Sequence, residues 1–325
     1  MKVHFGLEQV DPPIERAVLT IGNFDGFHRA HQQLLAQAGL HAANTGGPVV
    51  VLTFEPHPLT VVAPTKAPPR LSPLEEKLRC FAEAGADVAV VARSDPGLLG
   101  LEAERFVEEV VRRRFQPTHI VEGPSFGFGR GRKGTADTLR RLAAAFGCEV
   151  HIVEPVTLQV DEGETLLVSS SLIRRLIREG KVRRAALCLG RPYALIGTVV
   201  EGERRGATLG FPTANLQIRE QLVPGHGVFA GNAVLEGARH PCAVSIGAKP
   251  TFDGQATIIE AHLLDFGGDL YGKTLRLEFD RRLREQQRFG SPEALAAQLH
   301  RDVEAVRQAS CPPGEPRDGV GVQTT

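Results

Sequence analysis

Residues 19–31 read LTIGNFDGFHRAH and pass from an apolar segment through two glycines into a polar stretch. The apolar start predicts a buried strand, and Gly22 and Gly26 allow the tight turn that follows it. The helix predicted from His28 points its free N–H groups and its positive end back toward that turn. A strand, a glycine turn and a helix start in this order predict a polyphosphate-binding site.

Short β-branched segments alternate with helical ones up to about residue 168. We expect strands at Ala17–Ile21, Val49–Phe54, Val88–Ala92, His119–Val121 and Glu149–Val153. We expect helices at His28–Ala43, Pro73–Ala84, Glu102–Phe115 and Thr135–Phe146, the second of them starting with a capping box from Ser72 to Glu75. This alternation predicts an α/β domain in which helices cover a parallel sheet and ligands bind at the carboxyl ends of the strands.

The pattern changes after Arg191. Segments typical of strands follow one another between Gly, Pro and Asp turns, at Tyr193–Glu201, Gly227–Leu235, Pro241–Ile246, Thr257–Leu264 and Thr274–Phe279. No long helix is predicted between them, which favours an antiparallel β-barrel. One helix, capped by Ser291, closes this half with an apolar stripe of Leu295, Leu299 and Val303.

The chain therefore divides into a domain over residues 1–187, a second over 188–309, and a disordered tail over 310–325. Two short helices, Ser171–Glu179 and Arg183–Leu189, bridge the halves. A length of 325 residues fits two domains of ordinary size.

Composition excludes several classes of protein. Lys plus Arg and Asp plus Glu are both 38, so no overall field favours nucleic acid or an anionic membrane. No apolar run approaches the roughly 20 residues that span a bilayer, and the first ten residues have no signal-peptide core. Five cysteines without CxxC spacing argue against a disulfide framework or a structural zinc site. We expect a cytoplasmic protein.

His28 and His31 are three residues apart and share one helix face beside the glycine turn. Two imidazoles there can donate hydrogen bonds to phosphate oxygens and stabilise charge that develops at an α-phosphate. Two histidines at this spacing are often simple surface residues, but their position directly after a strand and a glycine turn favours the phosphate site.

A second glycine-rich stretch, residues 202–215, reads GERRGATLGFPTAN. Glycines and arginines in a loop after a strand suit a flap that wraps phosphates. The turn that follows offers the Thr213 hydroxyl and the Asn215 amide oxygen, which are hard ligands suited to Mg²⁺. A solvated hairpin is the alternative for glycine and arginine taken alone.

Together these motifs resemble those of the prokaryotic bifunctional riboflavin kinase/FAD synthetase family, over about residues 14–308. The first domain matches at GxFDGxHxxH, at residues 53–58 (TFEPHP), at 123–129 (GPSFGFG) and at 169–174 (SSSLIR). The second matches at LGFPTAN and at residues 227–230, 245–251, 259–266, 269–273 and 283–285. The resemblance implies a Rossmann-like HxGH nucleotidyltransferase domain followed by an antiparallel barrel of the riboflavin kinase type.

The resemblance implies that His28, His31 and Arg174 are catalytic in an FMN adenylyltransferase site, with Arg174 reaching ATP phosphates. It places the remaining ATP contacts at Gly22, Asn23, Phe24, Asp25, Gly26, Ser125, Ser170 and Ser171, and a flavin contact at His57. The family usually has glycine at position 30 and a longer polar side chain at position 125. We therefore expect Ala30 and Ser125 to slow FAD synthesis without eliminating it.

In the second domain the resemblance makes Glu260 the general base for the ribityl 5′-hydroxyl and gives Thr213 and Asn215 to Mg²⁺. It places ATP phosphates at Gly202, Arg204, Arg205, Gly206 and Gly210, and the flavin at Tyr271 and Arg284. A solvent-facing strand residue is the alternative for Glu260, in the IIEAHLL alternation.

The expected function is phosphorylation of riboflavin to FMN and adenylylation of FMN to FAD, with ATP as co-substrate and Mg²⁺ as cofactor. Two alternatives stay open at this point. One is a riboflavin kinase whose first domain is weakened or inactive, and the other is a flavin-binding regulator without activity. The expected partners are the small molecules riboflavin, FMN and ATP, with neither nucleic acid nor membrane.

Overall fold

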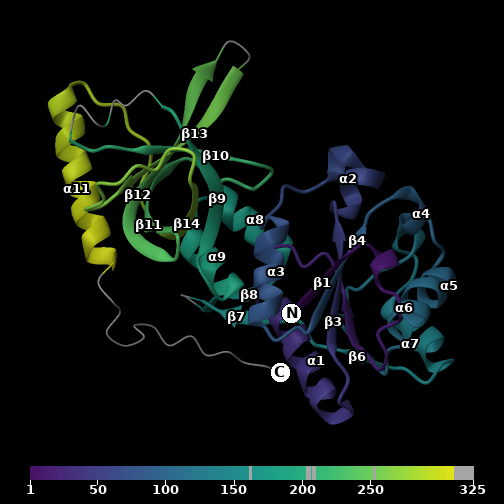
Figure 1. Cartoon of the computed structure of the whole chain (residues 1–325). Coiled ribbons are helices and arrows are strands. Elements are labelled where there is room, and N and C mark those ends of the chain that lie inside the picture. Colours follow the sequence, from purple (N-terminus) through teal and green to yellow (C-terminus); the bar gives the residue numbers. More distant parts are fainter. Residues whose placement is uncertain (161–162, 203–205, 207–209, 252–253, 311–325) are drawn as a thin grey trace.

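The computed structural model describes residues 1–160, 163–202, 206, 210–251 and 254–310, and shows a helix-covered sheet beside a closed barrel (Figure 1). The sheet strands are β1 (Lys2–Phe5), β2 (Val18–Ile21), β3 (Val49–Glu55), β4 (Val88–Arg93), β5 (His119–Glu122) and β6 (Glu149–Ile152). They lie in the order β1-β4-β3-β2-β5-β6, and every pair is parallel. The predicted α/β domain is thus confirmed, with β1 added at one edge.

Helices cover both faces of this sheet. They are α1 (Arg29–Thr45), α3 (Leu74–Glu83), α4 (Pro96–Leu99), α5 (Ala103–Arg105), the π-helix η3 (Phe106–Arg112), α6 (Arg113–Phe115) and α7 (Ala136–Ala144). Short helices η1 (Leu7–Gln9), α2 (Pro58–Val62), η2 (Pro64–Lys66) and η4 (Arg130–Arg132) lie in the loops. Because neighbouring strand residues point to opposite faces, Val51 packs with Leu35 and Phe81 of α1 and α3, while Leu52 packs with Val110 of η3.

The predicted capping box is wrong. Helix α3 begins at Leu74, so Pro73 is its N-cap and no side chain caps its first turn. Ser72 instead donates its backbone N–H to Asp25 Oδ1, at 3.1 Å, and so serves the glycine turn.

The carboxyl-terminal half is a closed antiparallel barrel in the order β10-β13-β12-β11-β14-β9. Its strands are β9 (Tyr193–Val200), β10 (Ala214–Ile218), β11 (Gly227–Leu235), β12 (Ala238–Thr251), β13 (Gly254–Leu263) and β14 (Thr274–Arg284). Helix α11 (Pro292–Ser310) lies on the outer face, where Val306 packs against Ala230 and Leu264. The predicted barrel and closing helix are confirmed. Strand β10 was missed because residues 211–215 were interpreted as a rigid turn.

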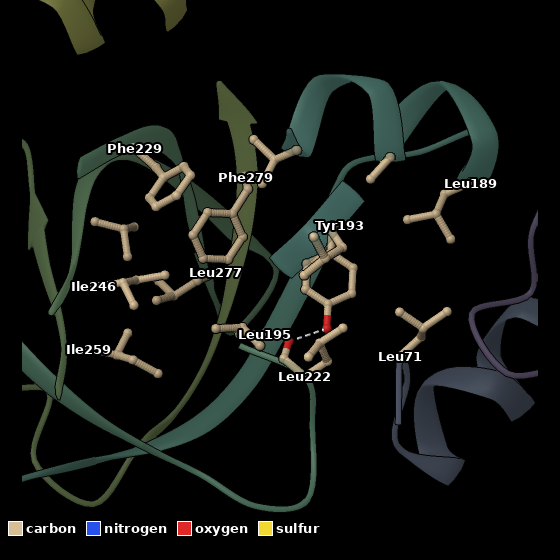
Figure 2. Close-up of a cluster of buried hydrophobic side chains, with 14 of the residues drawn as sticks. Leu71, Leu189, Tyr193, Leu195, Leu222, Phe229, Ile246, Ile259, Leu277 and Phe279 are labelled. Atoms are coloured by element: carbon tan, nitrogen blue, oxygen red, sulfur yellow. Dashed lines mark hydrogen bonds between the residues drawn. The ribbon is translucent and has the colours of Figure 1, made fainter. Parts of the chain in front are cut away.

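The junction between the halves is an extension of the barrel core. Helices α8 (Ser170–Arg178) and α9 (Val182–Leu189), with the hairpin β7 (Thr157–Gln159) and β8 (Thr165–Leu167), share one apolar cluster with the barrel interior. Figure 2 shows Tyr193 in this cluster, with its hydroxyl donating to the Leu222 carbonyl at 2.5 Å and with Leu71 of the first half nearby. A boundary between residues 187 and 188 falls inside α9.

Polar contacts also join the two halves. Arg276 of β14 donates to Glu76 of α3 at 2.5 Å, and Arg191 donates to the carbonyls of Gly26 and Phe27 at 3.0 Å. The glycine turn is therefore held from the barrel side as well as from its own sheet. At the other end of the chain, α11 includes Ser310, the first residue of the predicted tail. The rest of that prediction, residues 311–325, lies outside the described residues.

Candidate active sites

A cavity of about 880 Å³ opens at the carboxyl edge of the parallel sheet. It lies where β2 has β3 on one side and β5 on the other, the switch point at which such sheets bind ligands. Its walls include most of the predicted residues of the first site: Gly22, Asn23, Phe24, Asp25, His28, His31, His57, Ser125, Ser170, Ser171 and Arg174. Gly26 shapes the turn. Its φ of +83° favours glycine, and the Cβ of any other residue here would lie 2.8 Å from Leu71 Cδ1.

His28 and His31 stand together at the start of α1. Their rings stack with centroids 3.6 Å apart, and His28 is the N-cap residue without a side-chain capping bond. Within the described part of the chain, neither buried Nδ1 atom has a hydrogen-bond partner. Buried polar atoms without a partner are uncommon in folded proteins, and both histidines line the cavity.

Burial decides the charge of these two rings. It lowers the pKa of His28 to about 4, with Arg174 and Arg191 nearby acting in the same direction. Burial also lowers the pKa of His31 well below its usual value, and the neighbouring His28 adds to the effect. At neutral pH both rings are uncharged in the free protein, so each has one N–H to donate and brings no positive charge of its own.

Arg174 reaches the cavity wall but its guanidinium is engaged. Its Nη2 lies 2.5 Å from Asp25 Oδ2, and its Nε donates to the Pro69 carbonyl at 2.9 Å. Asp25 also accepts the backbone N–H of Leu71, at 3.0 Å to either oxygen. Ser170 Oγ donates to the Asp25 carbonyl at 2.9 Å. Asp25 and Arg174 therefore hold the glycine turn in place, and phosphate contact by either stays a prediction.

His57 is far from the histidine pair in sequence, but in space it lies beside the glycine turn. Its Nε2 is 3.2 Å from Asn23 Nδ2, and its Nδ1 accepts the Leu59 N–H at 3.2 Å. Ser125 is exposed at the cavity edge, where Arg132 donates to its carbonyl at 3.1 Å. Arg132 itself lines the cavity and was missed, although the basic run at residues 130–133 was a usable signal.

Glu122 is a second residue that the sequence analysis missed. It ends β5, lines the cavity and is 2% exposed. The β2–β5 ladder stops at Leu19 and Ile120, and beyond it Glu122 Oε1 accepts the Ile21 N–H at 2.5 Å. Burial raises the pKa of Glu122 well above its usual value, which favours the neutral acid over the carboxylate. A single carboxyl at the end of an apolar strand does not by itself predict that the side chain is buried and bonded to the next strand.

The second candidate site lies on the outer face of the barrel. Ile259, Ala261 and Leu263 of β13 face the core, so Glu260 faces outward. Glu260 is paired directly with Asn215 of β10 on one side and with Ser245 of β12 on the other. Directly paired residues in antiparallel strands share a face, so the predicted base and one predicted metal ligand are neighbours. The predicted alternation of β13 is confirmed.

The glycines of the 202–215 stretch form a cradle for Thr213 and Asn215. A side chain at Gly202 would overlap the Asn215 amide, and one at Gly206 would overlap the Phe211 carbonyl and touch Thr213. Gly210 has φ of +85°. The hydroxyl and amide oxygens held here are the hard donors that Mg²⁺ prefers, so the residues fit that ion. Arg204 and Arg205 lie outside the described residues.

Arg284 and Tyr271, the predicted flavin contacts, differ in their surroundings. Arg284 forms a forked ion pair with Asp302 of α11, with Nη2–Oδ2 at 2.7 Å and Nε–Oδ1 at 3.0 Å. Asp302 is buried, so this pair fastens α11 to the barrel. Tyr271 is 45% exposed in the loop before β14. Their contact with flavin stays a prediction.

Comparison with known proteins gives two matches that follow the two halves of the structure. Residues 11–170 match the FAD synthetase family and residues 189–310 match the riboflavin kinase family. A bifunctional riboflavin kinase/FMN adenylyltransferase of Escherichia coli K12 is 36% identical, over 95% of this chain and 97% of its own. The corresponding protein of Pseudomonas fluorescens is also 36% identical, over 96% and 99%.

The chain belongs to the bifunctional riboflavin kinase/FMN adenylyltransferase family. The two-domain fold of this family extends to a solved structure from Streptococcus pneumoniae that is described as a macrolide-efflux protein. It is 29% identical with a TM-score of 0.84, over 94% of this chain and 99% of that one. Among helices in the described ranges, none combines the length and apolar character needed to cross a membrane.

Proposed function

We propose that this chain makes FMN from riboflavin at the barrel site and FAD from FMN at the sheet cavity. The observation that carries the proposal is the presence of both candidate sites on one chain. Glu260 is paired with Asn215 beside the glycine cradle, and two uncharged histidines line a cavity at the sheet switch point. We assign the adenylyltransferase to residues 1–187 and the kinase to residues 188–309.

In the kinase reaction, Glu260 takes the proton of the ribityl 5′-hydroxyl as its oxygen attacks the γ-phosphorus of ATP. The bond to the β–γ bridging oxygen breaks, ADP leaves, and FMN remains. Thr213 and Asn215 would hold Mg²⁺, which neutralises phosphate charge when bound. The register that sets Glu260 beside Asn215 supports a base next to the proposed metal and nucleotide site.

In the adenylyltransferase reaction, a phosphate oxygen of FMN attacks the α-phosphorus of a second ATP and pyrophosphate leaves. His28 and His31 donate N–H groups to the phosphate oxygens as charge builds there. Asp25 and Arg174 keep the glycine turn in the shape that lets phosphates approach its backbone. No covalent intermediate with the protein is needed.

Nothing in the cavity favours the alternative of a kinase with an inactive first domain. The Ala30 methyl lines the cavity, but the histidines, the turn and its anchors are all in place. A flavin-binding protein without activity would not need the outward-facing carboxylate of Glu260 beside Thr213 and Asn215 in the glycine cradle. We place the reactions in the cytoplasm, where riboflavin and ATP meet.

The test is chromatography of products after purified protein is incubated with riboflavin, ATP and Mg²⁺. The proposal predicts FMN followed by FAD. FMN alone would establish the kinase with an inactive first domain, and neither product would establish the flavin-binding regulator. Omitting Mg²⁺ and adding a chelator should stop FMN formation.

A further inference from the structure

Three histidines from separate elements meet on the α1 face of the sheet, away from the cavity. His41 lies in the last turns of α1, His119 begins β5, and His151 lies in β6. In the parallel register His119 pairs with Glu149 and Val121 pairs with His151, so all four side chains share the face that α1 covers. The cluster is at the opposite end of α1 from His28 and His31.

The ligand atoms of the three rings lie within 4.8 Å of one another. His119 Nδ1 is 3.0 Å from His151 Nε2, and the His41 ring stacks on that of His151 with centroids 3.8 Å apart. A tetrahedral zinc ion with bonds of ~2.1 Å holds its nitrogens about 3.4 Å apart. Small rotations of these half-buried side chains would bring the ring nitrogens from their present separations to those of a tetrahedral zinc site.

Glu149 lies close enough to offer a fourth ligand. Its Oε2 lies 4.0 Å from His119 Nδ1 and 3.8 Å from His151 Nε2, and its side chain is 72% exposed. Three imidazole nitrogens and one carboxylate oxygen form a donor set for zinc and related ions, whereas Mg²⁺ and Ca²⁺ prefer oxygen alone.

The charge of the cluster suits a cation. Burial lowers the pKa of His41, and the neighbouring His119 adds to the effect. Burial, followed by His41 and His119, lowers the pKa of His151, while Glu149 opposes both shifts. The lowered pKa values of His41 and His151 favour rings with a free lone pair, which is the form that binds a metal.

We propose that His41, His119, His151 and Glu149 form a binding site for one zinc-class divalent transition-metal ion. The ion joins the end of α1 to the β5–β6 edge. It takes no part in either phosphoryl transfer, because the proposed catalytic residues lie at the carboxyl edge of the sheet and on the barrel. Its effect is to stabilise the first domain.

The test uses the full chain, freed of any affinity tag and treated with a chelator. Co²⁺ and then Zn²⁺ are added with Mg·ATP present to occupy the nucleotide sites. We expect one Co²⁺ per chain with the visible absorption of a tetrahedral ion, displaced by Zn²⁺. Saturating Zn²⁺ should raise the melting temperature by about 5 °C or more.

His41→Gln, His119→Gln and His151→Gln should each weaken binding by at least about tenfold and abolish the thermal shift. His226→Gln, at an exposed histidine of the other half, is the matched control and should change neither. Without metal, all four variants should melt close to the parent, which shows that they fold. The proposal is overturned if no metal binds, if the three variants bind as the parent does, or if His28→Gln removes the signal instead.

Discussion

Arg174 of α8 and Asp25 of the glycine turn form a buried ion pair, with Nη2 and Oδ2 2.5 Å apart. Asp25 also receives the N–H groups of Leu71 and Ser72. One carboxylate thus joins the turn, the segment before α3 and the helix that leads to the barrel. We predict that an arginine held this way positions the glycine turn for the phosphate site.

Arg174→Met tests that role. Removing one partner of a buried pair leaves the other uncompensated, so the free energy of unfolding should fall by about 3 kcal/mol. FAD synthesis from supplied FMN should fall with it, mainly through kcat. Urea denaturation and steady-state kinetics measure both effects. A variant as stable as the parent, with only the KM for ATP raised, would assign Arg174 to the phosphates instead.

Stability should depend on pH through His28. Its folded-state pKa is about 4, below the unfolded value of about 6.5, so the unfolded chain binds the proton more readily. This dependence destabilises the fold as the pH falls from 7 toward 4, by about 2 kcal/mol at pH 5.

Urea denaturation of the parent and of His28→Gln at pH 7 and pH 5 measures this contribution. The variant should lose that much less stability than the parent on acidification. Equal losses in the two proteins would mean that His28 does not carry the effect. The comparison cancels the contribution of buried groups that do not contact His28, whereas the contribution of His31, which stacks on His28, changes with it.

Glu260→Gln should lower FMN formation by about 10²–10⁴-fold, because the amide cannot take the hydroxyl proton. FAD synthesis from supplied FMN is proposed to occur at the other site and should stay unchanged, which shows that the first domain folds. Glu236→Gln, at an exposed carboxylate that pairs with Lys273, is the matched control. Kinase activity of Glu260→Gln within a few-fold of the parent would remove Glu260 from the role of base.

The sequence predicted the strands and long helices well where periodicity and burial agree, as in β3 and α1. It could not show that Asp25 and Arg174, 149 positions apart, neutralise each other. It also could not show that Glu122 would be buried against Ile21, or that His41, His119 and His151 would meet. Such relationships depend on which strands become neighbours, and strand order is not visible in local patterns. Ser72 is a related case. Its sequence position predicts a helix cap, but its backbone N–H bonds to Asp25 of the glycine turn instead.

The boundary of the kinase unit is open to a fragment test. Val182 and Ala185 of α9 belong to the same apolar cluster as Tyr193 and Leu195 of the barrel. A fragment over residues 156–325 keeps that packing, whereas one over 188–325 exposes it. We expect the longer fragment to melt at least about 5 °C higher, since burial of each large apolar side chain contributes ~1.5–3 kcal/mol.

Both fragments should phosphorylate riboflavin at temperatures where they are folded. Thermal melts followed by circular dichroism, with kinase assays below each transition, give the result. Equal melting temperatures would show that α8 and α9 contribute nothing to the barrel. A folded longer fragment without kinase activity would contradict the assignment of the kinase to the barrel.

Ala30 is the position at which this chain departs from the HxGH pattern, and its methyl group both lines the cavity and packs against the cluster around α8 and α9. Ala30→Gly should raise the rate of FAD synthesis by letting phosphates approach the first turn of α1, while lowering stability by about 1 kcal/mol through helix propensity. Ala36→Gly, at an exposed position of the same helix, carries the same helix cost without touching the cavity and separates the two effects.

FAD formation from supplied FMN and ATP is measured for the parent and both variants, with riboflavin phosphorylation as the internal control. If Ala30→Gly and Ala36→Gly change the rate equally, the methyl group does not limit the reaction. If the parent makes no FAD and Ala30→Gly restores none, the first domain is inactive and the chain is a riboflavin kinase alone.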